Sequence, residues 1–248
     1  MADAPPLVLF SFPPALGLPI SESPPAAKVE LYLRLTGTPY SVQVGSTLKS
    51  PNKMVPYVRW PDGRLQGESG DIIAALEARC QLDTGCEPAA LDSGRELAEK
   101  VELTCYDACL HDRFTLAEGW TLQRPITASY MRLVLPGFIV PLALPYVRWT
   151  QIRRAARVTM ADPEAGYAAS VALIEAVSAR LEDGLFMCGD RPSTVDCCIW
   201  PVLLHVATTP NSSPPREAVR ADTRLVRWIE RVGSTAGYEL GSAWRGGG

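Results

Sequence analysis

The chain has 248 residues, enough for one large domain or two small ones, and its 47% of apolar residues can form a sizeable core. A net charge of −3 gives no general attraction to nucleic acid, so we expect no nucleic-acid partner. Most of the seven cysteines lie in apolar, apparently helical contexts, which indicates buried free thiols in a reducing compartment. With two histidines and no Cys-x-x-Cys spacing, we expect no bound metal.

The opening residues bear on where the protein works. A first strand at residues 7–12 begins too early to leave room for a targeting segment, and the opening MADAPP is acidic. We therefore expect a cytoplasmic protein.

The first half of the chain alternates between strand and helix patterns. Strand-like apolar runs, a Pro-Asp-Gly hairpin turn and two helical patterns follow one another before residue 84. In chain order, the predicted elements are strand 7–12, helix 25–35, strand 40–44, strands 54–60 and 64–66, and a helix that begins at Ser69. This order predicts a small α/β domain with a mixed sheet over residues 1–84.

From residue 85 onward the pattern is almost entirely helical. The segment DTGCEP, with its glycine and proline, predicts a linker between the two parts. The clearest helices are predicted at 93–111, 165–181, 194–206 and 222–232. The third of these is apolar on nearly every side, which indicates a helix buried inside an all-helical domain at residues 85–248.

A capping box is predicted at the start of that buried helix. Ser193 and Asp196 are three residues apart, so the serine hydroxyl can accept the N–H of Asp196 while the aspartate reaches back to the N–H of Ser193. This pair defines where a helix without a polar face begins. We assign both residues to folding and not to catalysis.

Residues 54–70, MVPYVRWPDGRLQGESG, contain the strongest functional signal. The strand edge at Val55 offers free backbone groups to a peptide, and Pro56 can be cis because an X-Pro bond favours trans by only about 0.5–1 kcal/mol. Glu68 can receive an ammonium group, and Ser69, at a helix N-terminus, can receive a carboxylate. A Val-Pro step followed by an acid-serine pair is typical of a thioredoxin-like domain that holds glutathione by its γ-glutamyl group.

With these motifs, the chain resembles the cytosolic glutathione transferases over nearly its full length. Residues 189–196, GDRPSTVD, are similar to the family's box before the buried helix, and Val55, Pro56, Glu68 and Ser69 are similar to its glutathione-binding residues. The resemblance implies a thioredoxin-like N-terminal domain followed by a helical glutathione-transferase C-terminal domain. It also implies glutathione as a co-substrate and a homodimer.

Within that family, the opening of the chain is most similar to the failed-axon-connections and metaxin-like branch. Residues 23–30, SPPAAKVE, match that branch's Ser-Pro-Phe-Cys-Leu-Lys-Val-Glu helix start with two departures. Pro25 replaces the aromatic residue, and Ala26 replaces the cysteine and so removes any dithiol chemistry. Ser23 stands where related transferases carry the serine or cysteine that meets the glutathione sulfur. Because the branch contains membrane-associated assembly components, a mitochondrion-associated location is the alternative to a cytoplasmic one.

Ser23 is the candidate catalytic residue. A free thiol has a pKa of about 8.5, and its thiolate is favoured by a hydrogen bond worth about 1.5–3 kcal/mol and by a helix dipole worth about 0.3–1 kcal/mol. We expect these effects to lower the thiol pKa by about 1–2 units, with Ser23 as a thiolate stabiliser and not a nucleophile. The alternative is an ordinary N-cap serine, and the Pro24-Pro25 pair removes two N–H groups that an anion would use. Lys28 is expected on a solvated helix face.

Residues 133–147, LVLPGFIVPLALPYV, form the longest apolar run. The run is shorter than the ~20 residues that cross a bilayer, and its three prolines predict an irregular segment. It is followed by Arg148, Arg153, Arg154 and Arg157. One interpretation is core packing; the other is an exposed apolar ridge with a basic flank that contacts a membrane surface or a membrane-associated protein partner through residues 133–157.

Two functions remain open from the sequence. The first is a glutathione transferase that adds the thiolate to a small apolar electrophile, in a pocket between the two domains lined by Trp120, Tyr130 and Phe138. The second is a catalytically silent subunit or adaptor of a membrane-associated assembly, for instance at mitochondria, that keeps the glutathione-transferase fold for docking. Ser23 together with the Glu68-Ser69 pair favours the first function. The second is favoured by Pro25, Ala26, the long loop from Pro13 to Glu22 and the apolar run.

Overall fold

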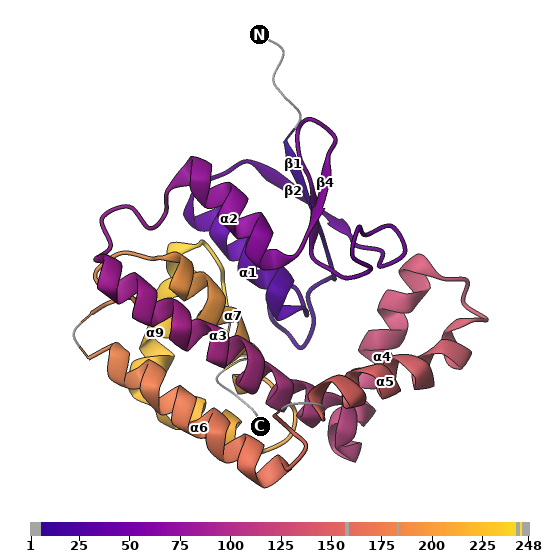
Figure 1. The fold of residues 1–248 in the computed structure, drawn as a ribbon. Coiled ribbons are helices and arrows are strands. Elements are labelled where there is room, and N and C mark those ends of the chain that lie inside the picture. The colour runs from indigo at the N-terminus through magenta and orange to yellow at the C-terminus, as the bar shows by residue number, and fades with distance from the viewer. Residues whose placement is uncertain (1–5, 157–158, 183, 242–243, 245–248) are drawn as a thin grey trace.

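The computed structural model describes residues 6–156, 159–182, 184–241 and 244 (Figure 1). Residues 1–5 and Arg157 lie outside the described residues. The prediction of a cytoplasmic location rests partly on the first of these, and the predicted basic flank includes Arg157.

The N-terminal part is a four-stranded mixed sheet with two helices against one face (Figure 1). The strand order is β2 (Tyr40–Val44), β1 (Leu7–Ser11), β3 (Tyr57–Arg59) and β4 (Leu65–Gly67), with β1 and β2 parallel and the other pairs antiparallel. The helices are α1 (Pro24–Leu35) and α2 (Ser69–Cys80). The predicted thioredoxin-like fold is confirmed, although the strand predicted at 54–60 is shorter because its first residues form a loop.

Helix α1 is buried along most of its length because it is covered on two sides. Pro24 occupies its first position, where a missing N–H has no cost, and Gly37 follows its end with φ +63°. One side of α1 faces the sheet and α2, and another packs against the helical domain. The expected solvated position of Lys28 is wrong, because Lys28 is buried and forms an ion pair with Glu102 of α3 at 2.7 Å.

The remainder of the described chain is helical, as predicted. The helices are α3 (Pro88–Leu110), a π-helical turn η1 (His111–Thr115), α4 (Ala117–Val134), α5 (Val140–Ala155), α6 (Pro163–Arg180), α7 (Thr194–Ala207), α8 (Pro214–Ala221) and α9 (Thr223–Thr235). Helix α7 is almost completely buried and packs on α1, α3 and α8, so it joins the two parts of the molecule. The predicted domain boundary near residue 84 falls in the connection between α2 and α3 and stays a prediction.

At the start of α7 the capping box is present around one buried carboxylate. Asp196 accepts the N–H and the hydroxyl of Ser193 at 2.9 and 2.7 Å, the N–H of Met187 at 3.0 Å and the indole N–H of Trp228 at 2.9 Å. Burial raises the pKa of the Asp196 carboxyl, and the four donors oppose that rise. The carboxylate therefore ties α7 to α9 as well as to its own N-terminus.

The apolar run at 133–147 is more regular than predicted. Residues 135–139 separate α4 from α5, but α5 then continues through Pro141 and Pro145. Pro141 lies in the first turn, where its missing N–H would have no partner, and Pro145 removes a single helical hydrogen bond. Within the described ranges, none of the helices combines the length and the apolar character needed to cross a bilayer.

Candidate functional site

The Val55–Pro56 peptide bond is cis, and it lies beside the C-terminal end of β1. A Cβ added at Gly45 would be 2.6 Å from Cγ1 of Val55 and 3.2 Å from the backbone N of Ser11, so the missing side chain allows these three segments to approach. Pro56 is buried and leads into β3. In the described part of the chain, the backbone N–H and C=O of Val55 have no hydrogen-bond partner, which leaves the predicted free edge available.

Glu68 and Ser69 lie where β4 passes into α2, at the same end of the sheet. Glu68 has φ +60°, and its exposed carboxylate accepts a bond from Nδ2 of Asn52 at 2.7 Å. Ser69 is the first residue of α2, and no side chain among the described residues caps this helix. The first N–H groups of α2 are therefore free to bind an anion, as a helix N-terminus can.

Ser23 immediately precedes α1 and is buried. Its carbonyl accepts the N–H groups of Ala26 and Ala27 at 2.9 Å, and its own N–H donates to Oγ of Ser21 at 3.2 Å. The hydroxyl makes no capping bond to α1 and has no partner within the described chain. It is therefore not used as a side-chain N-cap in this structure.

The backbone brings Ser23, Val55 and Glu68 to one end of the sheet, although no hydrogen bond within the described chain joins them. Glu22 donates its N–H to the carbonyl of Pro13 at 3.2 Å, which returns the loop 12–22 to the end of β1 just before Ser23. In the sheet, Phe10 of β1 is paired with Tyr57, and Tyr57 with Gly67, the residue before Glu68. Among the described residues, no hydrogen bond joins Ser23 to Val55 or Glu68.

Helix α4 is attached to the loop that leads to Ser23. The amide nitrogen of Gln123 donates to the Glu22 carboxylate, and the Tyr130 hydroxyl donates to the carbonyl of Pro13 at 3.0 Å. The rings of Tyr130 and Phe12 are stacked with centroids 5.3 Å apart. Burial, together with the negative charge of Glu22, raises the pKa of Tyr130. Glu22 and Gln123 escaped the sequence analysis because they are close only through the tertiary fold.

Of the three residues predicted to line a pocket between the domains, only Tyr130 lies at their junction. Trp120 packs inside the helical domain against Phe114, with ring centroids 5.9 Å apart. Phe138 is 79% exposed in the connection between α4 and α5. The prediction is therefore wrong for Phe138, because α4 and α5 extend away from the junction and carry this residue with them (Figure 1).

Arg113, in the π-helical turn η1, is a further candidate that the sequence did not reveal. It is only 3% exposed, and its Nε and Nη2 atoms have no partner within the described chain. Its charge acts with burial to lower the pKa of His205 to about 3, while burial raises the pKa of Cys109 to about 11 against the effect of Arg113. His205 in turn contacts the carbonyl of Ser21 at 3.1 Å, so the guanidinium lies beside the loop that ends at Ser23. Turns of π-helix are rare in proteins but occur often at functional sites. Buried N–H groups such as Nε and Nη2 of Arg113 favour contact with an anionic or polarised oxygen.

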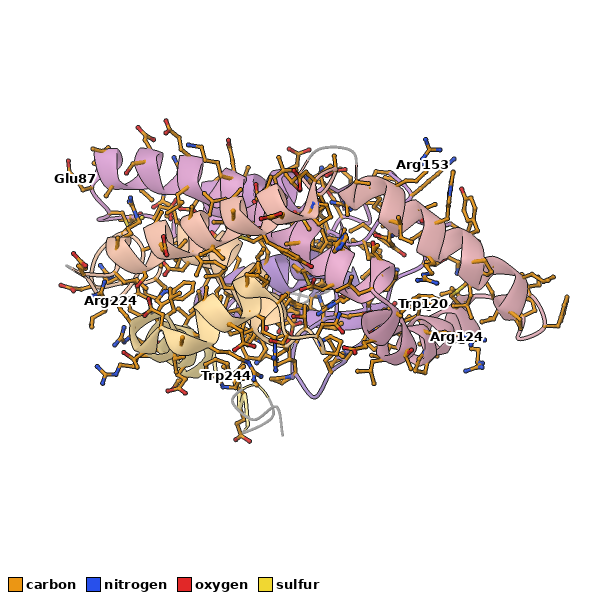
Figure 2. All side chains as sticks on the ribbon, turned by 90° about the horizontal axis from the view of Figure 1, so that it is seen from below. Glu87, Trp120, Arg124, Arg153, Arg224 and Trp244 are labelled. Atoms are coloured by element: carbon orange, nitrogen blue, oxygen red, sulfur yellow. The ribbon has the colours of Figure 1, made fainter. Side chains whose placement is uncertain are left out.

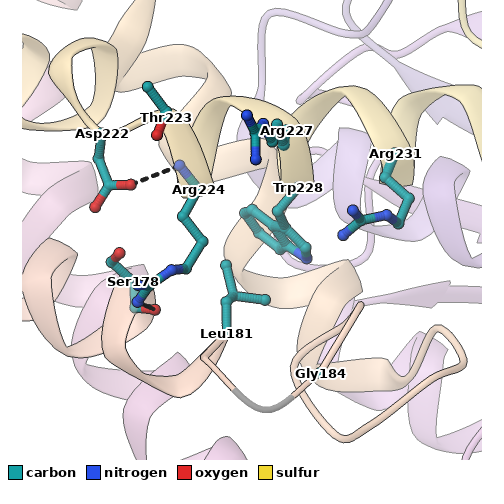
Figure 3. A pocket seen from close by; sticks show the side chains of 9 residues that line it. All are labelled: Ser178, Leu181, Gly184, Asp222, Thr223, Arg224, Arg227, Trp228 and Arg231. Carbon is teal, nitrogen blue, oxygen red and sulfur yellow. Dashed lines mark hydrogen bonds between the residues drawn. The ribbon is translucent and has the colours of Figure 1, made fainter.

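Two cavities lie elsewhere in the helical domain. One of about 370 Å³ opens between α6 and α9 and is lined by Arg224, Arg227 and Arg231 among others (Figure 3). Arg224 already donates to the carbonyl of Ser178 and to Glu182, and Arg231 to the carbonyl of Leu185. The second, of about 200 Å³, lies between α4 and α5. Neither is lined by a predicted glutathione-binding residue or by Ser23, although Trp120 lines the second. No group of metal-binding side chains occurs among the described residues.

Comparisons with known proteins match both parts of the chain. Residues 24–119 match the family described as the glutathione S-transferase N-terminal domain, and residues 172–232 match the glutathione S-transferase C-terminal domain; together they cover more than half of the chain. The chain is 26% identical over 239 residues to the isoprene-epoxide–glutathione S-transferase of Rhodococcus sp. (strain AD45), with 91% of this chain and 97% of that protein covered.

Solved structures agree on the fold. A glutathione S-transferase from Methylobacterium radiotolerans, in complex with glutathione sulfonate, is 18% identical with a TM-score of 0.57, covering 93% of this chain and 91% of that chain. The apo form of glutathione S-transferase III is 16% identical with a TM-score of 0.57, covering 93% and 92%. At these identities the likeness concerns the fold alone.

Proposed function

Because the chain belongs to the glutathione transferase superfamily, we propose that it binds glutathione and conjugates the glutathione thiolate to a small electrophile. The observation that carries this proposal is the meeting of three unsatisfied groups at one end of the sheet. These are the free backbone edge at Val55, the uncapped N-terminus of α2 and the unpartnered hydroxyl of Ser23.

The cysteine and γ-glutamyl parts of glutathione have chemically matched groups at this end of the sheet. The backbone of its cysteine would pair with Val55, which is held in place by the buried Pro56. The γ-glutamyl carboxylate would lie against Ser69 and the first N–H groups of α2, and the γ-glutamyl ammonium would meet the carboxylate of Glu68. The Asn52 amide orients that carboxylate by its 2.7 Å hydrogen bond.

We assign Ser23 the role of a thiolate stabiliser. Its hydroxyl would donate a hydrogen bond to the sulfur, and the α1 dipole acts in the same direction. The Pro24-Pro25 pair offers no N–H, and the N–H groups of Ala26 and Ala27 bond to the Ser23 carbonyl, so the hydroxyl is the principal donor at this helix start. Together these effects would lower the thiol pKa by about 1–2 units.

For the electrophile we propose a small epoxide, as in the name of the Rhodococcus relative. The thiolate would attack a ring carbon, so that a C–S bond forms and a C–O bond breaks. The electron pair of the broken bond would stay on oxygen, and the resulting alkoxide would take a proton to give a hydroxy thioether. Arg113 is the proposed partner of that oxygen; because its Nε and Nη2 atoms are buried, the residues that cover them would have to shift when the electrophile binds.

The test is binding and turnover with matched controls. Glu68→Ala should weaken glutathione affinity, measured by calorimetry, about 10- to 100-fold, because a charge-assisted hydrogen bond is lost. Ser23→Ala should leave binding nearly unchanged and move the rise of the pH–rate profile upward by about 1–2 units. Glu99→Ala and Ser41→Ala, at exposed positions, should change neither property. If the wild-type protein does not bind glutathione at any concentration, the proposal is wrong.

Several finer assignments remain proposals. The relationship to the failed-axon-connections and metaxin-like branch rests on residues 23–30, and the comparisons that match transferases give no support to the catalytically silent adaptor. A homodimer, proposed from the family resemblance, and a cytoplasmic location, with association with mitochondria as the alternative, also remain proposals.

A further inference from the structure

Helices α4 and α5, with the segment that joins them, project from the body of the molecule; we call residues 117–155 the α4–α5 hairpin (Figure 1). Large apolar side chains on the outer surface of this hairpin are exposed to solvent. Phe138 and Leu142 are each 79% exposed, Tyr146 66% and Trp149 49%. At the helical period of 3.6 residues Leu142, Tyr146 and Trp149 fall on one face of α5, and Phe138, two residues before α5 begins, extends this exposed apolar stripe at its start.

The opposite face of α5 is apolar as well, and it is covered. Val140, Leu144 and Ala155 are buried against α4 and η1. A helix that is apolar on both sides is normally buried on both sides, yet within the described chain nothing covers the outer stripe. A contiguous exposed apolar surface of this kind marks a contact with a protein or a membrane.

The charge of the hairpin distinguishes between these partners. From Gly119 to Ala161 the sequence contains no aspartate or glutamate, whereas the whole chain has a net charge of −3. The arginines of the hairpin are Arg124, Arg132, Arg148, Arg153 and Arg154. Arg153 lies over the ring of Trp149 with its Cζ 4.8 Å from the centroid, so a cation flanks the apolar stripe directly.

A symmetric contact with a second copy of this chain is disfavoured. A two-fold interface brings the same patch of each subunit together, and here it would bring two acid-free arginine clusters into contact. An anionic lipid surface instead offers negative phosphates above an apolar layer, which matches arginines beside an aromatic stripe. The cavity of about 200 Å³ between α4 and α5 adds an exposed cation, because Arg124 lines it together with Trp120; both residues are labelled in Figure 2. Arg148 also lines this cavity, but its guanidinium already donates to the carbonyls of Phe114 and Thr115.

We propose that the α4–α5 hairpin binds the surface of an anionic lipid bilayer. The stripe of Phe138, Leu142, Tyr146 and Trp149 lies at the boundary between headgroups and acyl chains. Arg153, beside the stripe, and the exposed arginines Arg124, Arg132 and Arg154 contact lipid phosphates. The protein lies on the bilayer and does not span it. The residues of this surface are separate from those proposed to bind glutathione.

The experiment is co-sedimentation of the full chain with vesicles of 70% phosphatidylcholine and 30% phosphatidylserine, compared with vesicles of phosphatidylcholine alone. Leu142→Ser with Trp149→Ser removes half of the stripe, and Arg153→Gln with Arg154→Gln removes two charges. The matched controls are Leu48→Ser, an exposed leucine of the first domain, and Arg227→Gln, an exposed arginine of α9.

The wild-type protein should sediment with the anionic vesicles, and binding should weaken when sodium chloride is raised from 0.1 to 0.5 M. The arginine pair should cost about 10-fold or more in affinity, and the apolar pair should abolish binding, with both controls unchanged. Three outcomes would overturn the proposal: no sedimentation with anionic vesicles, equal binding by all variants, or a dimer in analytical ultracentrifugation that Leu142→Ser with Trp149→Ser converts to monomer. Tm and glutathione binding, measured on every variant, show that each one is folded.

Discussion

Replacing Asp196 with alanine should be among the most damaging single changes in this chain. The substitution leaves four buried donors without an acceptor: the N–H and hydroxyl of Ser193, the N–H of Met187 and the indole N–H of Trp228. Removing one partner from a buried, hydrogen-bonded charge typically costs about 3–5 kcal/mol. We therefore expect Asp196→Ala to lower the free energy of unfolding by about 4 kcal/mol.

The assay is urea unfolding followed by circular dichroism, and a graded series tests the reasoning. Ser193→Ala removes the hydroxyl and should cost about 1 kcal/mol. Trp228→Phe removes the indole N–H and some packing, and should cost about 1–3 kcal/mol. Asp190→Ala, six residues earlier and exposed, should be nearly neutral. The explanation is refuted if Asp196→Ala costs less than Ser193→Ala, because the carboxylate would then not be the centre of the network.

Three further predictions concern the residues around the candidate site. Burial lowers the pKa of His205 from 6.5 to about 3, so protonation of this histidine favours the unfolded chain. Lowering the pH from 7.5 to 5 should therefore reduce the free energy of unfolding by about 2 kcal/mol. His205→Gln should not show this loss. Arg113→Met removes a buried charge whose Nε and Nη2 lack partners, so it should raise the unfolding free energy by about 1–4 kcal/mol while slowing epoxide conjugation; a loss of stability would contradict us. Gly45→Ala would place a methyl group 2.6 Å from Cγ1 of Val55, so glutathione affinity should fall several-fold in calorimetry.

Control substitutions separate these effects from general damage. Arg227→Met, at an exposed arginine, should leave stability unchanged, in contrast to Arg113→Met. Gly137→Ala, where an added Cβ meets nothing within 4 Å, should leave glutathione affinity unchanged, in contrast to Gly45→Ala. For His205, urea unfolding of the wild-type protein and of His205→Gln is measured at pH 7.5 and at pH 5. The difference between the two proteins gives the contribution of the histidine, because the carboxyl groups, which titrate mainly below pH 5, are common to both.

Local patterns were sufficient to predict much of the fold. The predicted helix 25–35 is observed at 24–35, and the capping box placed the start of α7 at the observed residue. These features depend on interactions between residues close in sequence. The same holds for the cis-capable Val55–Pro56 step and the glutamate-serine pair before α2.

What the sequence could not predict depends on which elements pack together. Lys28 was predicted to be solvated, but α3 packs over it and pairs it with Glu102. Phe138 was predicted to line a pocket, but it is exposed because α4 and α5 extend away from the junction between the domains. Arg113 gave no local signal, because its burial arises from tertiary packing of the turn between α3 and α4, with His205 of α7 within reach of its charge. The regular course of α5 through Pro145 was missed because one lost hydrogen bond is offset by packing on α4.

The attachment of α4 to the loop before Ser23 has a consequence for how this molecule would respond to its surroundings. Gln123 and Tyr130 belong to the projecting hairpin, yet they hold Glu22 and Pro13. Any ligand that displaces α4 therefore also displaces the chain leading to the sulfur. By thermodynamic reciprocity, occupancy of the tripeptide site must alter vesicle affinity by the same factor by which vesicles alter tripeptide affinity. Two titrations, each carried out with and without the other ligand, would measure this coupling.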